Sequence, residues 1–179
     1  TFLELYKIST KPRSFIGFGA ITAIILIIEF ALYIDGKTYL QFITNSLEQS
    51  FVIDGNILNG NLVCFIILQT LIVQMPLLVA LVTGDLISGE AASGTIRLLL
   101  TKPVSRAQIL GAKYVAGSMY TFLLLLWLGI LALGIGRLLF GHGDLMVLKT
   151  DELVILRDGD ILWRFLGAFL IAFLSLSVI

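Results

Sequence analysis

The amino-acid sequence predicts an all-α integral membrane protein, a polytopic helical bundle with four membrane spans visible. Of its 179 residues, 58% are hydrophobic and only 13% are charged. A soluble domain of this length carries about 25% charged residues and has too small an interior to bury so many apolar side chains. The apolar residues also fall into long segments, and a helix needs roughly 20 such residues to cross a bilayer. Lipid is therefore the expected solvent for most of the chain.

The predicted spans are residues 15–34, 62–83 and 105–140, followed by a fourth that begins at 161 and reaches 179 inside an apolar run. We therefore expect one transmembrane domain over 1–179, incomplete at its C-terminal end and part of a longer polypeptide. The formal net charge is zero, so the composition points to no nucleic-acid partner. Cys64 is the single cysteine, which excludes a disulfide framework within the sequence.

The first 13 residues mix apolar and charged side chains in the pattern of an amphipathic helix that lies in the membrane interface. A frayed basic terminus that anchors the first span is the alternative. Further along, two pairs of small residues four positions apart offer faces for close helix packing. These pairs are Gly19 with Ala23 and Ala132 with Gly136.

Glu29 lies within the first predicted span. An ionised carboxylate is costly in hydrocarbon, so this side chain should face protein or water rather than lipid. Two roles are compatible with that position. Glu29 either bonds to a neighbouring helix or reaches the outer interface, or it belongs to a translocation path and contacts substrate or responds to protons.

The first outer loop, residues 35–60, predicts an interfacial helix because apolar residues recur at 40, 43, 47 and 51. The tripeptide Gly36-Lys37-Thr38 is similar to the end of a phosphate-binding loop. However, Ala31 stands where such a loop requires its first glycine, so the sequence contains no Walker A loop. We expect no ATP chemistry, and no enzymatic activity, from this chain.

The second predicted span carries three polar side chains and a proline. Pro76 cannot donate to the carbonyl of Ile72, which predicts a kink. The polar side chains either form hydrogen bonds between helices or line a translocation path. They are Gln69, Thr70 and Gln74.

Residues 85–113 concentrate charge, glycine, proline and helix caps between two apolar segments. Ser93 is placed to cap a short helix over 95–100, which Pro103 ends because a proline disfavours α geometry in the residue before it. Ser105 and Gln108 then have the spacing of a capping box at the start of the next helix. That helix meets no breaker before Gly134 or Gly141, so it would be about 50 Å long and project beyond the membrane.

The order of residues in this loop resembles the signature cytoplasmic loop of the type-two ABC exporter permeases. The matching residues are Gly89-Glu90, Gly94-Thr95-Ile96, Leu98-Leu99-Leu100, Lys102-Pro103-Val104-Ser105-Arg106, Gly111 and Lys113. The resemblance implies that loop 85–104 contains a coupling helix seated in a cleft of a partner ABC ATPase, which holds ATP and Mg. It also favours an interfacial "elbow" helix over 1–13 and implies six spans in the full protein and a second permease copy.

The coupling residues that the resemblance implies divide by role. The glycines permit chain reversals, the leucines fill an apolar cleft, and the charged side chains fix orientation; an ordinary capped loop is the alternative. They are Gly89, Glu90, Gly94, Thr95, Arg97, Leu98, Leu99, Leu100, Pro103, Ser105 and Arg106.

The second outer loop, residues 141–160, contains the apolar pieces 145–148 and 153–156, which are either a hairpin or a re-entrant pair. Its acidic residues lack the regular spacing of metal ligands, and His142 is interpreted as a solvated loop residue, so no metal site is predicted. Trp163 and Arg164 form the interfacial anchor of the fourth span.

The expected function is that of the membrane-spanning permease subunit of an ABC exporter, which couples ATP hydrolysis by a partner to transport. The alternative is a non-transporting anchor that transmits ATPase-driven movement to a partner on the outer face. Positive charge concentrates in residues 1–13 and 85–113, so both are expected to be cytoplasmic, in the inner (plasma) membrane.

This topology predicts which positions an impermeant thiol reagent reaches. In a Cys64→Ala background, Thr44→Cys should be labelled in intact cells and Ser93→Cys only after permeabilisation. The reverse pattern would show that the charge argument for orientation is wrong.

Overall fold

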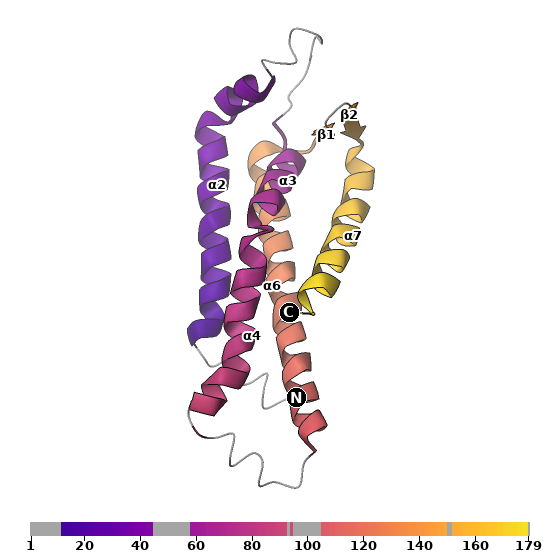
Figure 1. Ribbon diagram of the computed structural model, residues 1–179. Coiled ribbons are helices and arrows are strands. Elements are labelled where there is room, and N and C mark those ends of the chain that lie inside the picture. Colours follow the sequence, from indigo (N-terminus) through magenta and orange to yellow (C-terminus); the bar gives the residue numbers. More distant parts are fainter. Residues whose placement is uncertain (1–11, 45–57, 93, 95–104, 150–151, 179) are drawn as a thin grey trace. The chain divides into compact units, whose positions relative to one another are not determined.

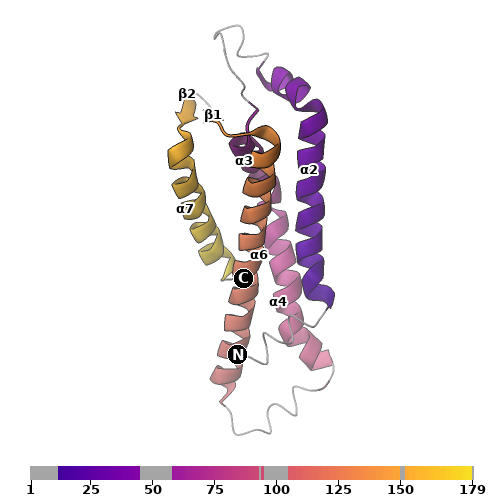
Figure 2. The same ribbon diagram turned by 180° about the vertical axis from the view of Figure 1, so that it is seen from behind.

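The computed structural model describes residues 12–44, 58–92, 94, 105–149 and 152–178 (Figures 1 and 2). Within them the chain is mostly helical. The elements are α2 (Pro12–Thr44), α3 (Gly60–Leu71), α4 (Gln74–Ala92), α6 (Arg106–Phe140), β1 (Leu145–Lys149), β2 (Glu152–Leu156) and α7 (Asp158–Leu176). The expected elbow helix lies outside the described residues, apart from the two residues that begin α2.

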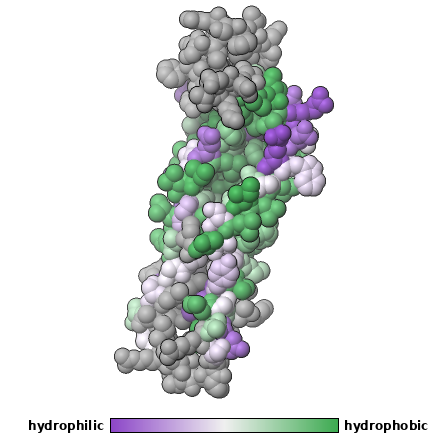
Figure 3. All heavy atoms as spheres, turned by 45° about the vertical axis from the view of Figure 1, so that its right-hand side comes forward, coloured by the Kyte–Doolittle hydropathy of each residue, from purple (hydrophilic) through white to green (hydrophobic). Residues whose placement is uncertain are grey.

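Three helical segments are long and apolar enough to cross a membrane, namely Ser14–Gly36, Ala107–Phe140 and Asp158–Leu176. A fourth candidate consists of α3 and α4 together, if this bent pair forms one span. Hydrophobic residues cover much of the coloured surface in view in Figure 3. These findings agree with the predicted class of a polytopic helical membrane protein.

The kink predicted in the second span is confirmed. α3 ends at Leu71 and α4 begins at Gln74, so the helix is broken over the two residues between them. Pro76 has no N–H to donate to the carbonyl of Ile72, so a continuous helix would lose a hydrogen bond there and would bring the proline ring against that carbonyl.

The capping box at the start of α6 is confirmed. The amide of Gln108 donates to Ser105 Oγ at 3.3 Å, and the amide of Ser105 donates to Gln108 Oε1 at 3.2 Å. From there α6 continues for 35 residues to Phe140. Gly141 follows with a φ of 75°, which glycine adopts without steric cost, and its amide donates to the carbonyl of Arg137 at 3.0 Å.

α2 extends beyond residue 34, the predicted end of the first span, to Thr44. The helix expected in the following loop is therefore continuous with the first span as far as the structure describes it. The absence of a side chain at Gly36 lets the Leu58 side chain pack closely against α2, since a Cβ at this position would lie 2.7 Å from Leu58 Cδ2.

Residues 145–149 and 152–156 form the two antiparallel strands of a hairpin rather than a re-entrant pair. β1 and β2 pair in a register that joins Leu145 to Leu156 and Lys149 to Glu152. Leu145 is buried, whereas Ile155 is 60% exposed. The described part of the chain is thus mostly helical with one two-stranded sheet.

The chain divides into two compact units. The first contains the described residues of 1–20, 72–127 and 170–179, and the second those of 21–71 and 128–169. In the first unit, the Tyr120 hydroxyl donates to the carbonyl of Ser14 at 3.2 Å, and the Tyr120 ring meets the Phe18 ring edge-on. These two contacts of Tyr120 join α6 to the beginning of α2.

In the second unit, α3 lies beside the C-terminal end of α6 (Figures 1 and 2). A Cβ at Gly60 would lie 2.6 Å from the backbone nitrogen of Arg137, and a Cβ at Gly136 would lie 3.2 Å from the carbonyl oxygen of Gly60. Gly136 is thus a packing position, as its small size predicts. At Gly19, which belongs to the other predicted pair, an added Cβ would have no atom within 4 Å, so this glycine is not a close-packing position.

Gly60→Ala should destabilise the protein, because the added methyl group meets backbone atoms of α6 that cannot move aside without separating the helices. We expect a loss of about 1–3 kcal/mol, measured as a lower thermal midpoint in detergent. Gly134→Ala is the control, since a Cβ there meets nothing within 4 Å, and it should be neutral or stabilising by up to about 1 kcal/mol. Equal midpoints for the two variants would contradict the close crossing.

Candidate functional site

The structure describes both ends of the loop implicated in ATPase coupling. Gly89 and Glu90 lie within α4, which runs to Ala92. The expected chain reversal at Gly89 is therefore wrong, because its backbone continues the helix. Gly94 has a φ of 71° just beyond the helix end, a left-handed conformation that fits the reversal expected there.

The other end of the loop is fixed by Ser105, which caps α6, so that Arg106 is the first residue of that helix. The central coupling positions lie outside the described residues. These are Thr95, Arg97, Leu98, Leu99, Leu100 and Pro103.

A groove of about 610 Å³ lies in the first unit, between α4, the first half of α6 and the end of α7. Small residues such as Gly84, Gly111 and Gly117 line it and leave this space. Lys113, only 7% exposed, is the cation of the lining. The Thr83 hydroxyl donates to the carbonyl of Val79 in its own helix, as lining hydroxyls on α6 do in theirs. Because their protons are used within the helices, these hydroxyl groups can act toward a ligand only as hydrogen-bond acceptors.

The four residues considered for a translocation path differ in their burial. Gln69 and Thr70 are exposed on α3, and the Thr70 hydroxyl donates to the carbonyl of Ile66 in the same helix at 2.9 Å. Gln74 is half-buried and belongs to the other unit. Glu29, in contrast, is only 1% exposed.

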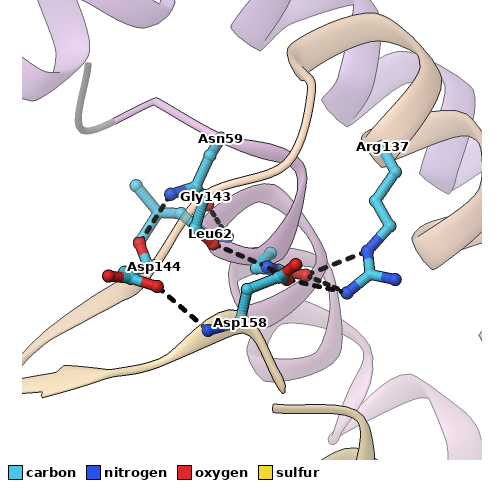
Figure 4. A network of polar contacts seen from close by, with 7 residues as sticks. Asn59, Leu62, Arg137, Gly143, Asp144 and Asp158 are labelled. Atoms are coloured by element: carbon cyan, nitrogen blue, oxygen red, sulfur yellow. Dashed lines mark hydrogen bonds and ion pairs between the residues drawn. The ribbon is translucent and has the colours of Figure 1, made fainter. Parts of the chain in front are cut away.

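A polar network around Arg137 joins the end of α6 to the beginnings of α3 and α7 in the second unit (Figure 4). The sequence alone did not predict it. Arg137 donates from Nε and Nη2 to Asn61 Oδ1, at 3.2 and 3.1 Å. Its Nη2 also forms an ion pair with Asp158 Oδ1 at 3.0 Å. Asn61 completes the triangle by donating from Nδ2 to the same Asp158 oxygen at 2.7 Å. We call these contacts, with those of Asn59 and Asp144 below, the Arg137 network.

The network also fixes the start of α3 and the hairpin. Asn59 caps α3, because its Oδ1 accepts the amide of Leu62 at 2.9 Å, while its Nδ2 donates to the carbonyl of Asp144 at 2.6 Å. The side chain of Asp144 in turn accepts the amide of Asp158 at 2.9 Å. The beginnings of α3 and α7, the end of α6 and the chain leading into β1 are thus joined by side chains.

The sequence does not reveal this network because its members are far apart in the chain; Asn61 and Asp158, for example, are separated by 97 positions. The local signal was Arg137, the first charged residue of α6 after Lys113, because a cation at the end of an uncharged stretch requires a partner. Among the described residues, no three His, Cys, Asp or Glu side chains are grouped in a way that could hold a metal ion. The network is thus an arrangement of hydrogen bonds and one ion pair.

Comparison with known proteins identifies the family. Residues 4–179 match the sequence model of the family described as ABC-2 family transporter protein. The chain belongs to this ABC-2 transporter family. The match extends over the apolar helices, the hairpin and the loop that was likened to the type-two permeases.

Two curated relatives are similar to parts of this ABC-2 chain. One is the uncharacterized protein YhcI of Bacillus subtilis, 32% identical over 99 residues, which make up 55% of the chain and 31% of the relative. The other is the probable ABC transporter permease protein NosY of Stutzerimonas stutzeri, 43% identical over 68 residues, or 37% of the chain and 25% of the relative. The matches therefore span less than a third of either relative. No solved structure matches.

The Arg137 network yields a prediction for stability. Arg137→Ala removes the donors to Asn61 Oδ1, in a residue that is 0% exposed, and leaves Asp158 without its cation. We expect a loss of about 1–3 kcal/mol, because a buried acceptor is left unsatisfied. Arg137→Lys should lose less, since it keeps the charge but not the paired donors. Arg157→Ala, at an exposed position, serves as control; if its thermal midpoint falls as far as that of Arg137→Ala, the network is not stabilising.

Proposed function

We propose that this chain is the membrane-spanning part of the permease subunit of an ABC exporter, which couples ATP hydrolysis by a partner ATPase to transport. The observation that carries the proposal is the ABC-2 family match over residues 4–179, on a chain with three to four span candidates. ATP and Mg are held by the separate ATPase subunit, because the sequence has no Walker A loop.

In this proposal, the ATPase acts on the helix over 95–100. That segment lies between the end of α4 and the capped start of α6. A force on it therefore reaches both helices directly through the backbone. α6 has no break over its 35 residues, so movement at Arg106 is carried along the whole helix to Arg137 and the network there.

The transporter contains two permease copies, each with six spans, whose interface forms the path. Residues 1–13 form the elbow helix, and they and residues 85–113 face the cytoplasm at the inner (plasma) membrane. The excess of positive charge in these segments supports this orientation.

A non-transporting anchor is the second candidate. It is supported by the hairpin, which the Arg137 network fastens to the helix ends and which could pass movement to a partner on the outer face. Vesicles containing the permease and its ATPase separate the two functions. An exporter moves solute when ATP is added, whereas an anchor retains an outer-face protein and moves none.

Leu99→Asp should weaken association with the ATPase. Burial of one leucine in a protein cleft is worth about 1.5–3 kcal/mol, and a carboxylate adds a desolvation cost in the same place. Arg106→Ala should have a smaller effect, because a charge at the rim contributes less than a buried apolar anchor. Co-purification of the ATPase in detergent and transport-stimulated ATP hydrolysis measure both effects.

The control is Arg164→Ala, which removes an exposed charge on α7. It should leave ATPase retention unchanged. Wild-type retention by Leu99→Asp, with normal insertion, would mean that residues 85–113 are not the docking element.

A further inference from the structure

Glu29 on α2 is buried without a polar partner. The residue is 1% exposed, and neither carboxyl oxygen has a hydrogen-bond partner among the described residues. Its Oε1 lies 3.8 Å from the position that a Cβ would occupy on Gly136. Glu29 therefore lies against the crossing of α3 and α6, within the second unit.

Among the side chains that the structure describes, no charged or titratable group neutralises Glu29. On α6, Arg137 is engaged by Asn61 and Asp158. On α3, Cys64 is 0% exposed and within electrostatic range of both Glu29 and Arg137, but a thiol supplies no positive charge. On α2 itself, Tyr33 and Asp35 are exposed. An ionised Glu29 would thus be a buried charge without a counter-ion among the described side chains, a state that proteins avoid by neutralising the group.

The packing limits what could neutralise Glu29. At the crossing, a Cβ on Gly60 would lie 2.6 Å from the nitrogen of Arg137 and one on Gly136 would lie 3.2 Å from the carbonyl of Gly60. Because Glu29 is only 1% exposed beside this crossing, solvent and larger cations do not reach its carboxyl group while the helices are packed as described. A metal cation would require several oxygen ligands, and the described residues contain no such cluster. A proton is the cation that fits.

We propose that Glu29 is a proton-binding site that is closed by the crossing of α3 and α6. While the helices are packed as described, Glu29 holds the proton as a neutral carboxylic acid. When α3 separates from α6 at Gly60, water reaches the carboxyl group, which releases its proton to that water and becomes an ionised, hydrated carboxylate. Because the two states differ in bound protons, acid favours the packed crossing and alkali favours the open one.

This inference concerns the folded chain and does not rest on the proposed transport role. If transport were disproved, Glu29 would still bind its proton; if the proton site were disproved, coupling through residues 85–104 would be unaffected.

The protonation state is tested by infrared spectroscopy of the full-length protein in lipid nanodiscs at neutral pH. The wild type should show the C=O stretching band of a protonated carboxylic acid, and Glu29→Gln should lose it. Asp35→Asn, which changes an exposed acid on the same helix, should keep the band. Absence of the band from the wild type, or its persistence in Glu29→Gln, would overturn the proposal.

Opening of the crossing is tested by the rate at which a maleimide labels Cys64, one turn from Gly60 on α3. The rate rises with pH in any variant, because the thiolate reacts, so the informative quantity is the ratio of wild type to Glu29→Gln. This ratio should increase with pH, since the wild type alone gains a charge that opens the crossing. The same charge by itself disfavours the Cys64 thiolate, so it cannot produce the increase without opening. The ratio of wild type to Asp35→Asn should stay constant.

If the ratio of the Cys64 labelling rates of wild type and Glu29→Gln is constant with pH, ionisation of Glu29 does not open the crossing, and this part of the proposal is overturned. Failure of Glu29→Gln to fold would overturn the neutral state itself, because an uncharged amide reproduces a protonated acid in size and charge.

Discussion

The contact between Gly60 and Gly136 is the constraint on which the second unit depends. Two glycines without side chains bring the backbones of α3 and α6 so close that a single methyl group would separate them. This approach places Asn61 within reach of Arg137, and it also closes the space beside Glu29. The polar network and the buried acid are thus two results of one backbone contact.

Features encoded within a few neighbouring residues could be predicted from the sequence. The Ser105–Gln108 capping box, the bend before Pro76 and the glycine that ends α6 each depend on the chemistry of one helical turn. The long spans were equally visible, since each requires only a continuous run of apolar residues. The family resemblance arose from the same kind of local information, the order of residues within one loop, and the family match over 4–179 confirmed it.

Features that depend on residues far apart in the sequence could not be predicted. Asn61 and Asp158 look like ordinary loop residues until the fold brings them together, and residues 145–156 read equally well as a hairpin or as re-entrant helices. Of the residues considered for a translocation path, Glu29 is buried whereas Gln69 and Thr70 are exposed, a difference that helical periodicity in an apolar segment does not reveal. Glycine at 89 suggested a reversal, yet it continues α4, because packing and neighbouring residues override a single weak propensity.

The two-residue break between α3 and α4 also has a mechanical consequence. It falls at the boundary between the two units, which α2, α6 and α7 pass as unbroken helices. A bend at residues 72 and 73 therefore disrupts no intact helical turn, whereas a bend within α6 would have to break hydrogen bonds of a continuous helix.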